Sequence, residues 1–235
     1  MAICVPQPFD SGLIGAPVYR IEIASADEIA SLRDLVPEDA ALVSVRIPVS
    51  WGMPTANSGF REIETLVSLE RPLAHEDTDF RAAAIRFSRP GDADACSAIA
   101  KTTFAADRYH ADPLVADSVA ARIKAAWARN EVTGRADRTF IYEKDGAILG
   151  FNGCLVRDGL MIVDLIAVAD GHQGKGIGAQ LLRAAFAFYA ARLGKTLIAT
   201  QAGNHGALAL YRKLGYVETA RSRTFHFTPE PVGIA

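Results

Sequence analysis

The chain has 235 residues, half of them hydrophobic, which is enough for one large domain or for a standard domain with a small companion. Its 25 basic and 27 acidic residues give a net charge of −2, so there is no overall positive field to attract nucleic acid or an anionic membrane surface. The three cysteines are far apart and lack CxxC spacing, so neither a disulfide framework nor a zinc site is expected.

The N-terminal stretch MAICVPQPFDSG lacks the basic region and the long apolar core of a signal peptide. No run of apolar residues approaches the length of a membrane span. We therefore expect a cytoplasmic protein with reduced thiols, no bound metal and neither a nucleic-acid nor a membrane partner.

The first 78 residues are expected to form a small α/β domain, because alternating apolar residues typical of strands flank one short helical pattern. The elements predicted there are strands at 17–23, 41–49 and 61–71 and a helix at 26–35. A proline and a cluster of acids at 71–80 interrupt the apolar patterning. We place the domain boundary there and assign residues 79–235 to a second domain.

The second domain is predicted to follow the order βααβββαβαβ. Its predicted elements are a strand at 82–90, helices at 91–104 and 116–132, a hairpin at 138–156 turning at Asp145-Gly146, a strand at 159–169, a helix at 176–193, a strand at 195–202, a helix at 204–216 and a strand at 220–227. Residues 228–235 are expected to fray. This order predicts a mixed sheet covered by helices, with ligands at the carboxyl ends of the parallel strands.

The helix at 176–193 repeats apolar residues at 181, 182, 185, 186, 189 and 193, so one of its faces should lie in the core. A glycine-rich turn precedes it directly, and the free amides at a helix N-terminus suit a phosphate. A Walker A motif is excluded because Lys175 is followed by Gly176 instead of Ser or Thr. The glycine spacing also fails the dinucleotide pattern GxGxxG.

The pattern that fits is Gln/Arg-x-x-Gly-x-Gly/Ala after a strand, at residues 173–178. Here the sequence resembles the GCN5-related N-acetyltransferase (GNAT) superfamily, over about Ala82 to Phe227. The resemblance implies a mixed, mostly antiparallel sheet with a splayed pair of parallel central strands and flanking helices, preceded by the small α/β domain. An ordinary glycine-rich βα turn is the alternative.

In that family the turn binds the pyrophosphate of the cosubstrate acetyl-CoA through backbone amides, and the preceding strand pairs with the pantetheine arm. The resemblance implies acetyl-CoA contacts at Ile166, Ala167, Val168, Gln173, Gly174, Lys175, Gly176, Ile177, Gly178, Asn204 and Ala207.

Asn204 and Tyr211 are seven residues apart, so both project from one face of the predicted helix at 204–216. The resemblance implies that Asn204 contacts pantetheine and that Tyr211 is the catalytic acid near the sulfur. A phenol with a pKa of about 10 is protonated at pH 7 and can donate to the leaving thiolate. Backbone amides near 166–168 would bind the oxyanion. A plain N-cap at Asn204 and a core aromatic at Tyr211 are the alternatives.

Asp164 is the only carboxylate inside the apolar strand at 159–169, and we name it as the candidate catalytic base. A strand-end residue facing solvent is the alternative, and water could also remove the proton. The histidines His172, His205 and His226 are expected to be surface or structural residues.

The loop between the first two helices of the second domain is where the family lines its acceptor cleft. Arg108, Tyr109 and His110 there are candidate substrate-binding residues, able to meet a diphosphate or a base ring by charge and stacking. A solvated loop is the alternative.

The stretches at 102–113 and 198–216, with the N-terminal block, resemble N-acetyltransferases of nucleotide-activated 4-amino-4,6-dideoxyhexoses. The expected function is acetyl-CoA-dependent N-acetylation of a small-molecule amine, preferably such a nucleotide sugar. The alternatives are acetylation of a protein N-terminus, a lysine or a small amine, and a non-catalytic acyl-CoA-binding module. Association into a homodimer is left open.

Overall fold

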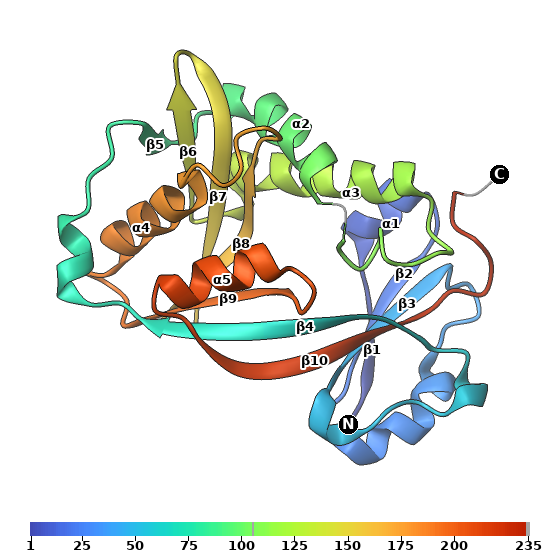
Figure 1. The fold of residues 1–235 in the computed structure, drawn as a ribbon. Helices are drawn as coiled ribbons and strands as arrows, with labels where there is room; N and C mark the ends of the chain where they lie inside the picture. Colours follow the sequence, from blue (N-terminus) through green and yellow to red (C-terminus); the bar gives the residue numbers. More distant parts are fainter. Residues whose placement is uncertain (105, 234–235) are drawn as a thin grey trace.

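The computed structural model of the protein describes residues 1–104 and 106–233. Within them, one continuous sheet has the strand order β1-β2-β3-β10-β4-β9-β8-β7-β6-β5 (Figure 1). The strands are β1 (Ile3–Pro6), β2 (Val18–Glu22), β3 (Leu42–Pro48), β4 (Arg61–Pro72), β5 (Ile85–Phe87), β6 (Arg138–Lys144), β7 (Ala147–Arg157), β8 (Leu160–Val168), β9 (Lys195–Gln201) and β10 (Val217–Phe227). The pairs β2/β3 and β8/β9 are parallel and the others antiparallel, so the sheet is mixed and mostly antiparallel, as predicted.

Helices cover both faces of this sheet. They are α1 (Pro8–Ile14), α2 (Ala93–Thr103), α3 (Asp117–Asn130), α4 (Ile177–Tyr189) and α5 (His205–Lys213), with 3₁₀ segments at Ala26–Leu35, Val49–Trp51, Ala56–Ser58, His75–Asp79 and Pro90–Asp92 and a π-helical turn at Glu131–Arg135. Helices α1, α2 and α3 pack on one face, and α4, α5 and the Ala26–Leu35 segment pack on the other (Figure 1). No helix in the described ranges is long and apolar enough to cross a membrane.

The parallel strands β8 and β9 part in the middle of the sheet. Their pairing runs from Leu160↔Lys195 to Val163↔Ile198 and stops there, although β8 continues for five residues and β9 for three. The antiparallel pairing of β8 with β7 continues to Val168. The splayed pair of central strands predicted from the sequence is therefore present.

A β-bulge in β8 lies where this gap begins. Cys154 of β7 pairs with Val163, and Gly153 pairs with Leu165, so Asp164 has no partner across the ladder. The extra residue reverses which side chains face which helices. Before the bulge, Val163 packs in the core of α4 and α5; after it, Leu165 packs against α2 and α3.

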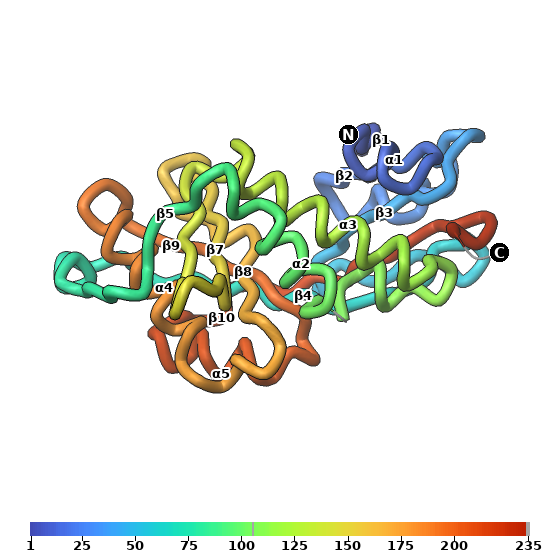
Figure 2. The backbone as a smooth tube through the Cα atoms, turned by 90° about the horizontal axis from the view of Figure 1, so that it is seen from above, coloured from blue at the N-terminus to red at the C-terminus, as the bar shows by residue number. Residues whose placement is uncertain are grey.

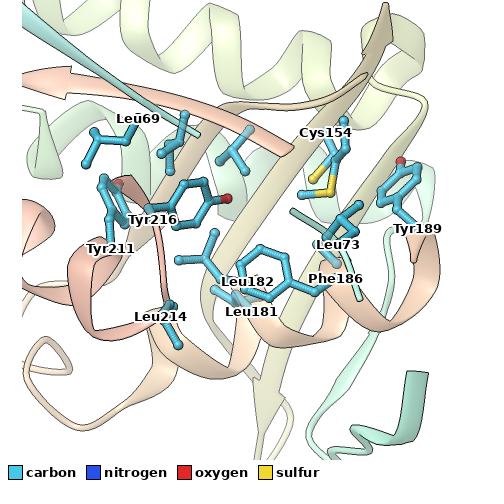
Figure 3. Close-up of a cluster of buried hydrophobic side chains, with 14 of the residues drawn as sticks. Leu69, Leu73, Cys154, Leu181, Leu182, Phe186, Tyr189, Tyr211, Leu214 and Tyr216 are labelled. Carbon is cyan, nitrogen blue, oxygen red and sulfur yellow. The ribbon is translucent and has the colours of Figure 1, made fainter. Parts of the chain in front are cut away.

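The core on the α4 face is built around the helix after the glycine turn (Figure 3). Leu181, Leu182, Ala185, Phe186 and Tyr189 are at most 1% exposed, which confirms the face predicted from their spacing. Each large apolar side chain buried in this way contributes about 1.5–3 kcal/mol to folding. This packing holds the N-terminus of α4 beside the end of β8.

The strand β4 comes from the N-terminal part of the chain but lies between β9 and β10, both from the C-terminal part. Figure 2 shows β1, β2 and β3, in blue, at one end of the molecule and β5 toward the other. The boundary between two domains at residues 78 and 79 stays a prediction. The sheet itself is continuous across that boundary.

Two terminal segments differ from the sequence prediction. Residues 3–14, left without an assignment, form β1 and α1; α1 begins at Pro8 and ends at Ile14, and Gly15 caps it with φ 84°. The tail predicted to fray is instead held: the Ala116 amide donates to the Val232 carbonyl (2.9 Å), and the Val232 amide donates to the Leu114 carbonyl (2.7 Å). That prediction is wrong for 228–233, while residues 234 and 235 lie outside the described ranges.

Gly153 is required by close packing at the bulge. A Cβ there would lie 2.9 Å from Cδ of Glu131 and closer still to its Oε2. Gly153→Ala should therefore lower the free energy of unfolding by about 1–3 kcal/mol, measured by urea denaturation. The control is Gly91→Ala, where an added Cβ meets nothing within 4 Å. Equal stability of the two variants would contradict this packing.

Candidate active site

The glycine turn after β8 is exposed and shaped by left-handed backbone. Gly171, Gly174 and Gly176 have φ of 75°, 73° and 80°, a region that glycine enters without steric cost. A Cβ at Gly174 or Gly176 would meet nothing within 4 Å, so the space before α4 is open. Side chains at these positions would occupy the space that a ligand needs to reach the main chain.

The first turn of α4 has unpaired amides. Its first helical hydrogen bond runs from the Gln180 amide to the Gly176 carbonyl (3.1 Å), so the preceding amides have no helical acceptor. These amides and the positive end of the helix dipole favour an anion. Gln173 ties the turn to β8, since its Nε2 donates to the Val168 carbonyl (3.3 Å). The geometry matches what a phosphate site requires.

Gly178 has a different task within the predicted motif. An added Cβ there would lie 3.3 Å from Cδ2 of Leu210, so the missing side chain lets α5 pack closely on α4. Ile177 is buried in the same core, whereas Lys175 is exposed beside the turn. Gly178 and Ile177 therefore hold the motif in place, and Lys175 supplies a cation to it.

The gap between β8 and β9 exposes main chain that a normal sheet would pair. From Asp164 onward, the β8 edge that faces β9 has no neighbouring strand. Residues Ile166 and Val168 are half-buried and Ala167 is buried, so their backbone lies at the wall of the gap. Unpaired N–H and C=O groups in such a wall need partners, and an extended ligand can supply them.

The start of α5 lies beside the end of β9. Asn204 is its N-cap: the side-chain oxygen accepts from the Ala207 amide (3.2 Å), and Nδ2 donates to Oγ1 of Thr200 (3.1 Å). The N-cap interpretation of Asn204 is thus confirmed. Its side chain is exposed, so its use as a ligand contact stays a prediction, as does that of Ala207.

Tyr211 lies two turns further along α5, in the core that α5 shares with α4 (Figure 3). It is 5% exposed, and its ring centroid lies 5.9 Å from that of Tyr216. Burial raises the pKa of the Tyr211 phenol, which therefore carries its proton at neutral pH. The structure agrees with a core aromatic and with a proton donor, and its catalytic role stays a prediction.

Asp164, the unpaired bulge residue, is exposed and bound to Arg135, whose Nε donates to Oδ2 (3.0 Å). Arg135 also contacts Oε1 of Glu131 (3.0 Å), a residue that is 2% exposed. Oε2 of Glu131 is buried and has no hydrogen-bond partner among the described residues. Burial first, and then the charge of Asp164, raise the pKa of Glu131 to about 8.

The sequence analysis missed Glu131, although one signal was available. It lies one residue before the end of the predicted helix at 116–132, and a glutamate in the last turn opposes the helix dipole. The structure bends the chain there into a π-helical turn, and such turns occur frequently at functional sites.

The loop with Arg108, Tyr109 and His110 packs against α1 and is not a solvated loop. Tyr109 is fully buried and donates to Oδ2 of Asp10 (2.5 Å), while Arg108 donates to the Tyr109 hydroxyl (3.0 Å). His110 pairs with Asp107 (2.5 Å). The Tyr109 ring is thus out of reach of a base in this structure, and Arg108, whose buried Nε has no partner among the described residues, keeps a free donor.

The histidines lie as predicted. His205 is exposed at the start of α5, His172 is half-buried in the glycine turn, and His226 is buried with Nδ1 2.8 Å from Oδ2 of Asp112. Within residues 1–104 and 106–233, no three His, Cys, Asp or Glu side chains gather in a way that could hold a metal ion.

The structure thus combines a splayed mixed sheet, a glycine turn at the mouth of the gap and a capped helix, the arrangement that the resemblance to acetyltransferases implied. A family model described as Acetyltransferase (GNAT) family matches residues 104–216. The chain thus carries a GNAT acetyltransferase domain at 104–216, as the sequence resemblance implied.

One curated protein is similar to part of this chain. The spore coat polysaccharide biosynthesis protein SpsD of Bacillus subtilis (strain 168) is 32% identical over 141 residues, which are 60% of this chain and 49% of SpsD. The chain thus matches about half the length of this curated relative.

Solved structures share the fold. A GNAT-family protein from Novosphingobium aromaticivorans DSM 12444 has a TM-score of 0.58 at 21% identity, over 90% of this chain and 83% of that one. A GCN5-related N-acetyltransferase from Sphaerobacter thermophilus has a TM-score of 0.58 at 16% identity, over 97% and 77% of the two chains.

Gly176→Val should weaken acetyl-CoA binding by at least about tenfold, because the side chain fills the space in front of the amides and strains a backbone at φ 80°. Isothermal titration measures the affinity. The matched control is Gly159→Val: its φ is 73°, an added Cβ also meets nothing within 4 Å, and it lies at the opposite end of β8. Equal affinities in two folded variants would contradict the assignment of the turn.

Glu131 should make stability depend on pH. Its pKa is raised in the folded state. Its contribution to the free energy of unfolding is therefore fully present below 4.5, the pKa in the unfolded chain, and is lost as the pH rises toward about 8. Glutamine mimics the protonated carboxyl and does not titrate. The free energy of unfolding of Glu131→Gln, relative to that of the wild type, should therefore rise by about 2 kcal/mol from pH 5 to pH 8.5, after allowance for screening by Arg135. Urea denaturation at several pH values measures this. For the control Glu38→Gln, in an exposed loop, the plot of unfolding free energy against pH should run parallel to that of the wild type. A parallel plot for Glu131→Gln would refute the raised pKa of Glu131.

Proposed function

We propose that the protein transfers the acetyl group of acetyl-CoA to an amino group, and that the acceptor is a nucleotide-activated amino sugar of the 4-amino-4,6-dideoxyhexose kind. The observation that carries the transfer is the gap between β8 and β9, with the glycine turn at its mouth. The β8 edge has no neighbouring strand, and the free amides of the glycine turn follow directly after it. Together they suit an elongated ligand that ends in a diphosphate.

In this proposal the amides of residues 173–178 and the ammonium of Lys175 bind the pyrophosphate of acetyl-CoA. The pantetheine arm lies along the β8 edge at 166–168, in the place that a neighbouring strand would occupy, and Asn204 contacts it from the start of α5. The coenzyme supplies the activated acetyl group. Its thioester then lies in the gap, open toward the face of α2 and α3.

The chemistry needs three proton transfers. Asp164, at the first unpaired position of β8, accepts through intervening water the proton that the ammonium loses before attack. The neutral amine then attacks the thioester carbonyl, and amides at 166–168 stabilise the oxyanion of the tetrahedral intermediate. As the C–S bond breaks, Tyr211 donates its proton to the sulfur, and the second proton that the nitrogen loses restores the Tyr211 phenol through water, so the products are an N-acetyl amide and free CoA thiol.

Two similarities support an amino-sugar acceptor. The sequence resembles dTDP-fucosamine N-acetyltransferase at 102–113 and 198–216, and SpsD is named for polysaccharide biosynthesis. Acetylation of a protein N-terminus, a lysine or a small amine is the second candidate activity. A non-catalytic acyl-CoA-binding module is the candidate from outside the enzymes.

A screen for thiol release separates these functions. The full chain and acetyl-CoA are combined with amino-sugar nucleotides, peptides, polyamines and amino acids in turn, and free CoA is measured. We expect release with amino-sugar nucleotides. Release with peptides or polyamines alone would favour the second candidate, and coenzyme binding without release from any amine would indicate the non-catalytic module.

Tyr211→Phe should lower turnover about 100-fold or more, because a positioned acid contributes that much, with little change in coenzyme affinity. The matched control is Tyr216→Phe, a neighbouring buried phenol whose hydroxyl lies 3.0 Å from Oγ1 of Thr196. It should lose about 1 kcal/mol of stability but keep its turnover. Thiol-release kinetics and titration measure both. Unaltered turnover in Tyr211→Phe would remove this residue from the mechanism.

A further inference from the structure

A row of polar side chains crosses the sheet on the face of α2 and α3 and ends at the gap. Thr224 of β10 pairs with Arg46 of β3 on one side and with Glu64 of β4 on the other. Glu64 accepts from the Thr224 hydroxyl (3.1 Å) and from Nε2 of Gln201 (3.0 Å). Gln201 ends β9, three residues beyond the last pair with β8, so Glu64 lies beside the gap.

Glu64 is a buried carboxylate whose hydrogen bonds come from neutral groups. It is 9% exposed, and no Lys, Arg or His nitrogen in the described part of the chain lies within 4.0 Å of it. An anion in such a place is costly unless a cation meets it. Among the described residues, the end of the row nearest the gap therefore has no cation in direct contact, although the charges of Arg46, Arg108 and Lys124 act on it from further away.

Arg46 is the opposite charge at the other end of the row. Its side chain is accessible, and no carboxylate among the described residues lies within ion-pair distance. Lost hydration, and next the positive charge of nearby Arg108, lower the pKa of Arg46 to about 10. The buried Nε of Arg108 has no hydrogen-bond partner among the described residues, while its Nη2 lies 3.4 Å from Oδ2 of Asp10. Asp10 thus pairs with one nitrogen of Arg108, and the guanidinium of Arg46 has no carboxylate of its own.

The two charges are held apart by the sheet. Strands β3 and β4 have β10 between them, so Arg46 and Glu64 start roughly 10 Å apart, from two strand spacings of about 4.8 Å. That span accommodates one sugar ring with its substituents. It is too long for the amine and carboxylate of an amino acid, whose charges sit on one carbon.

We infer that Arg46 and Arg108 bind the phosphate of the acceptor while Glu64 faces its ammonium, so that the N-terminal segment of the chain selects amino sugars that carry a phosphate on the ring. This inference rests on the proposed acetyl transfer and adds the orientation of its acceptor: amine at the gap, phosphate over β3. Guanidinium groups bind phosphate oxygens by paired, charge-assisted hydrogen bonds. A polyamine, with cations at both ends, would meet repulsion from Arg46.

The test compares acceptors with and without the phosphate. Thiol release is measured with dTDP-4-amino-4,6-dideoxygalactose, its UDP counterpart, the methyl glycoside of the same amino sugar, spermidine and an amino acid. Arg46→Ala should raise the KM for the nucleotide sugar about 10- to 100-fold, as expected for loss of one charge-assisted contact. The KM values for the methyl glycoside and for acetyl-CoA should not change, and Arg46→Lys should restore part of the loss.

The matched control is Arg183→Ala, an exposed arginine on α4, which covers the opposite face of the sheet. It should leave every KM unchanged. A nucleotide-sugar KM unaltered in Arg46→Ala would overturn the inference, as would a wild type that uses the methyl glycoside, spermidine or the amino acid equally well.

A second measurement separates this inference from the proposed function. Titration of dTDP alone should give an affinity at least about tenfold weaker in Arg46→Ala than in the wild type or Arg183→Ala. Equal affinities would contradict the phosphate site whatever the enzyme does. Absence of thiol release from every acceptor, with dTDP still bound through Arg46, would contradict only the acetyl transfer.

Discussion

The parting of β8 from β9 after Val163 and Ile198 is the constraint on which the other features of the site depend. Main chain inside a protein needs hydrogen-bond partners, and a strand that leaves its neighbour exposes a row of them. The bulge at Asp164 fits the parting, because it places Leu165 and Ala167 in the core of α2 and α3 while Ile166 and Val168 pack toward α4. The β8 edge can then stay open while both faces of the strand remain packed.

The gap also joins two chemically different faces. On the α4 side the glycine turn and the start of α5 present amides and a capping asparagine, which suit a phosphate-ended coenzyme. On the α3 side a polar row runs from Gln201 to Arg46, across strands from both ends of the chain. Because β4 lies between β9 and β10, the N-terminal segment completes the sheet and lines the side of the gap that we propose for the acceptor.

Local pattern predicted most elements of this fold. The spacing of Leu181 to Tyr189, the Asp145-Gly146 turn and the glycine run before α4 each depend on neighbouring residues, and each was found where expected. The bulge was not predictable, because Asp164 only interrupts a continuous apolar run. Nor were the contact of Glu131 with Asp164 and that of Arg46 with Arg108, since tertiary folding brings these charges together.

The central claim is that acetyl-CoA lies in the gap with its diphosphate on the glycine turn. A crystal structure of the protein with acetyl-CoA tests it most directly. The account predicts diphosphate oxygens within hydrogen-bonding distance of the amides at 173–178 and a pantetheine arm along β8 at 166–168. A coenzyme lodged elsewhere on the molecule, with the turn and the gap left empty, would contradict it.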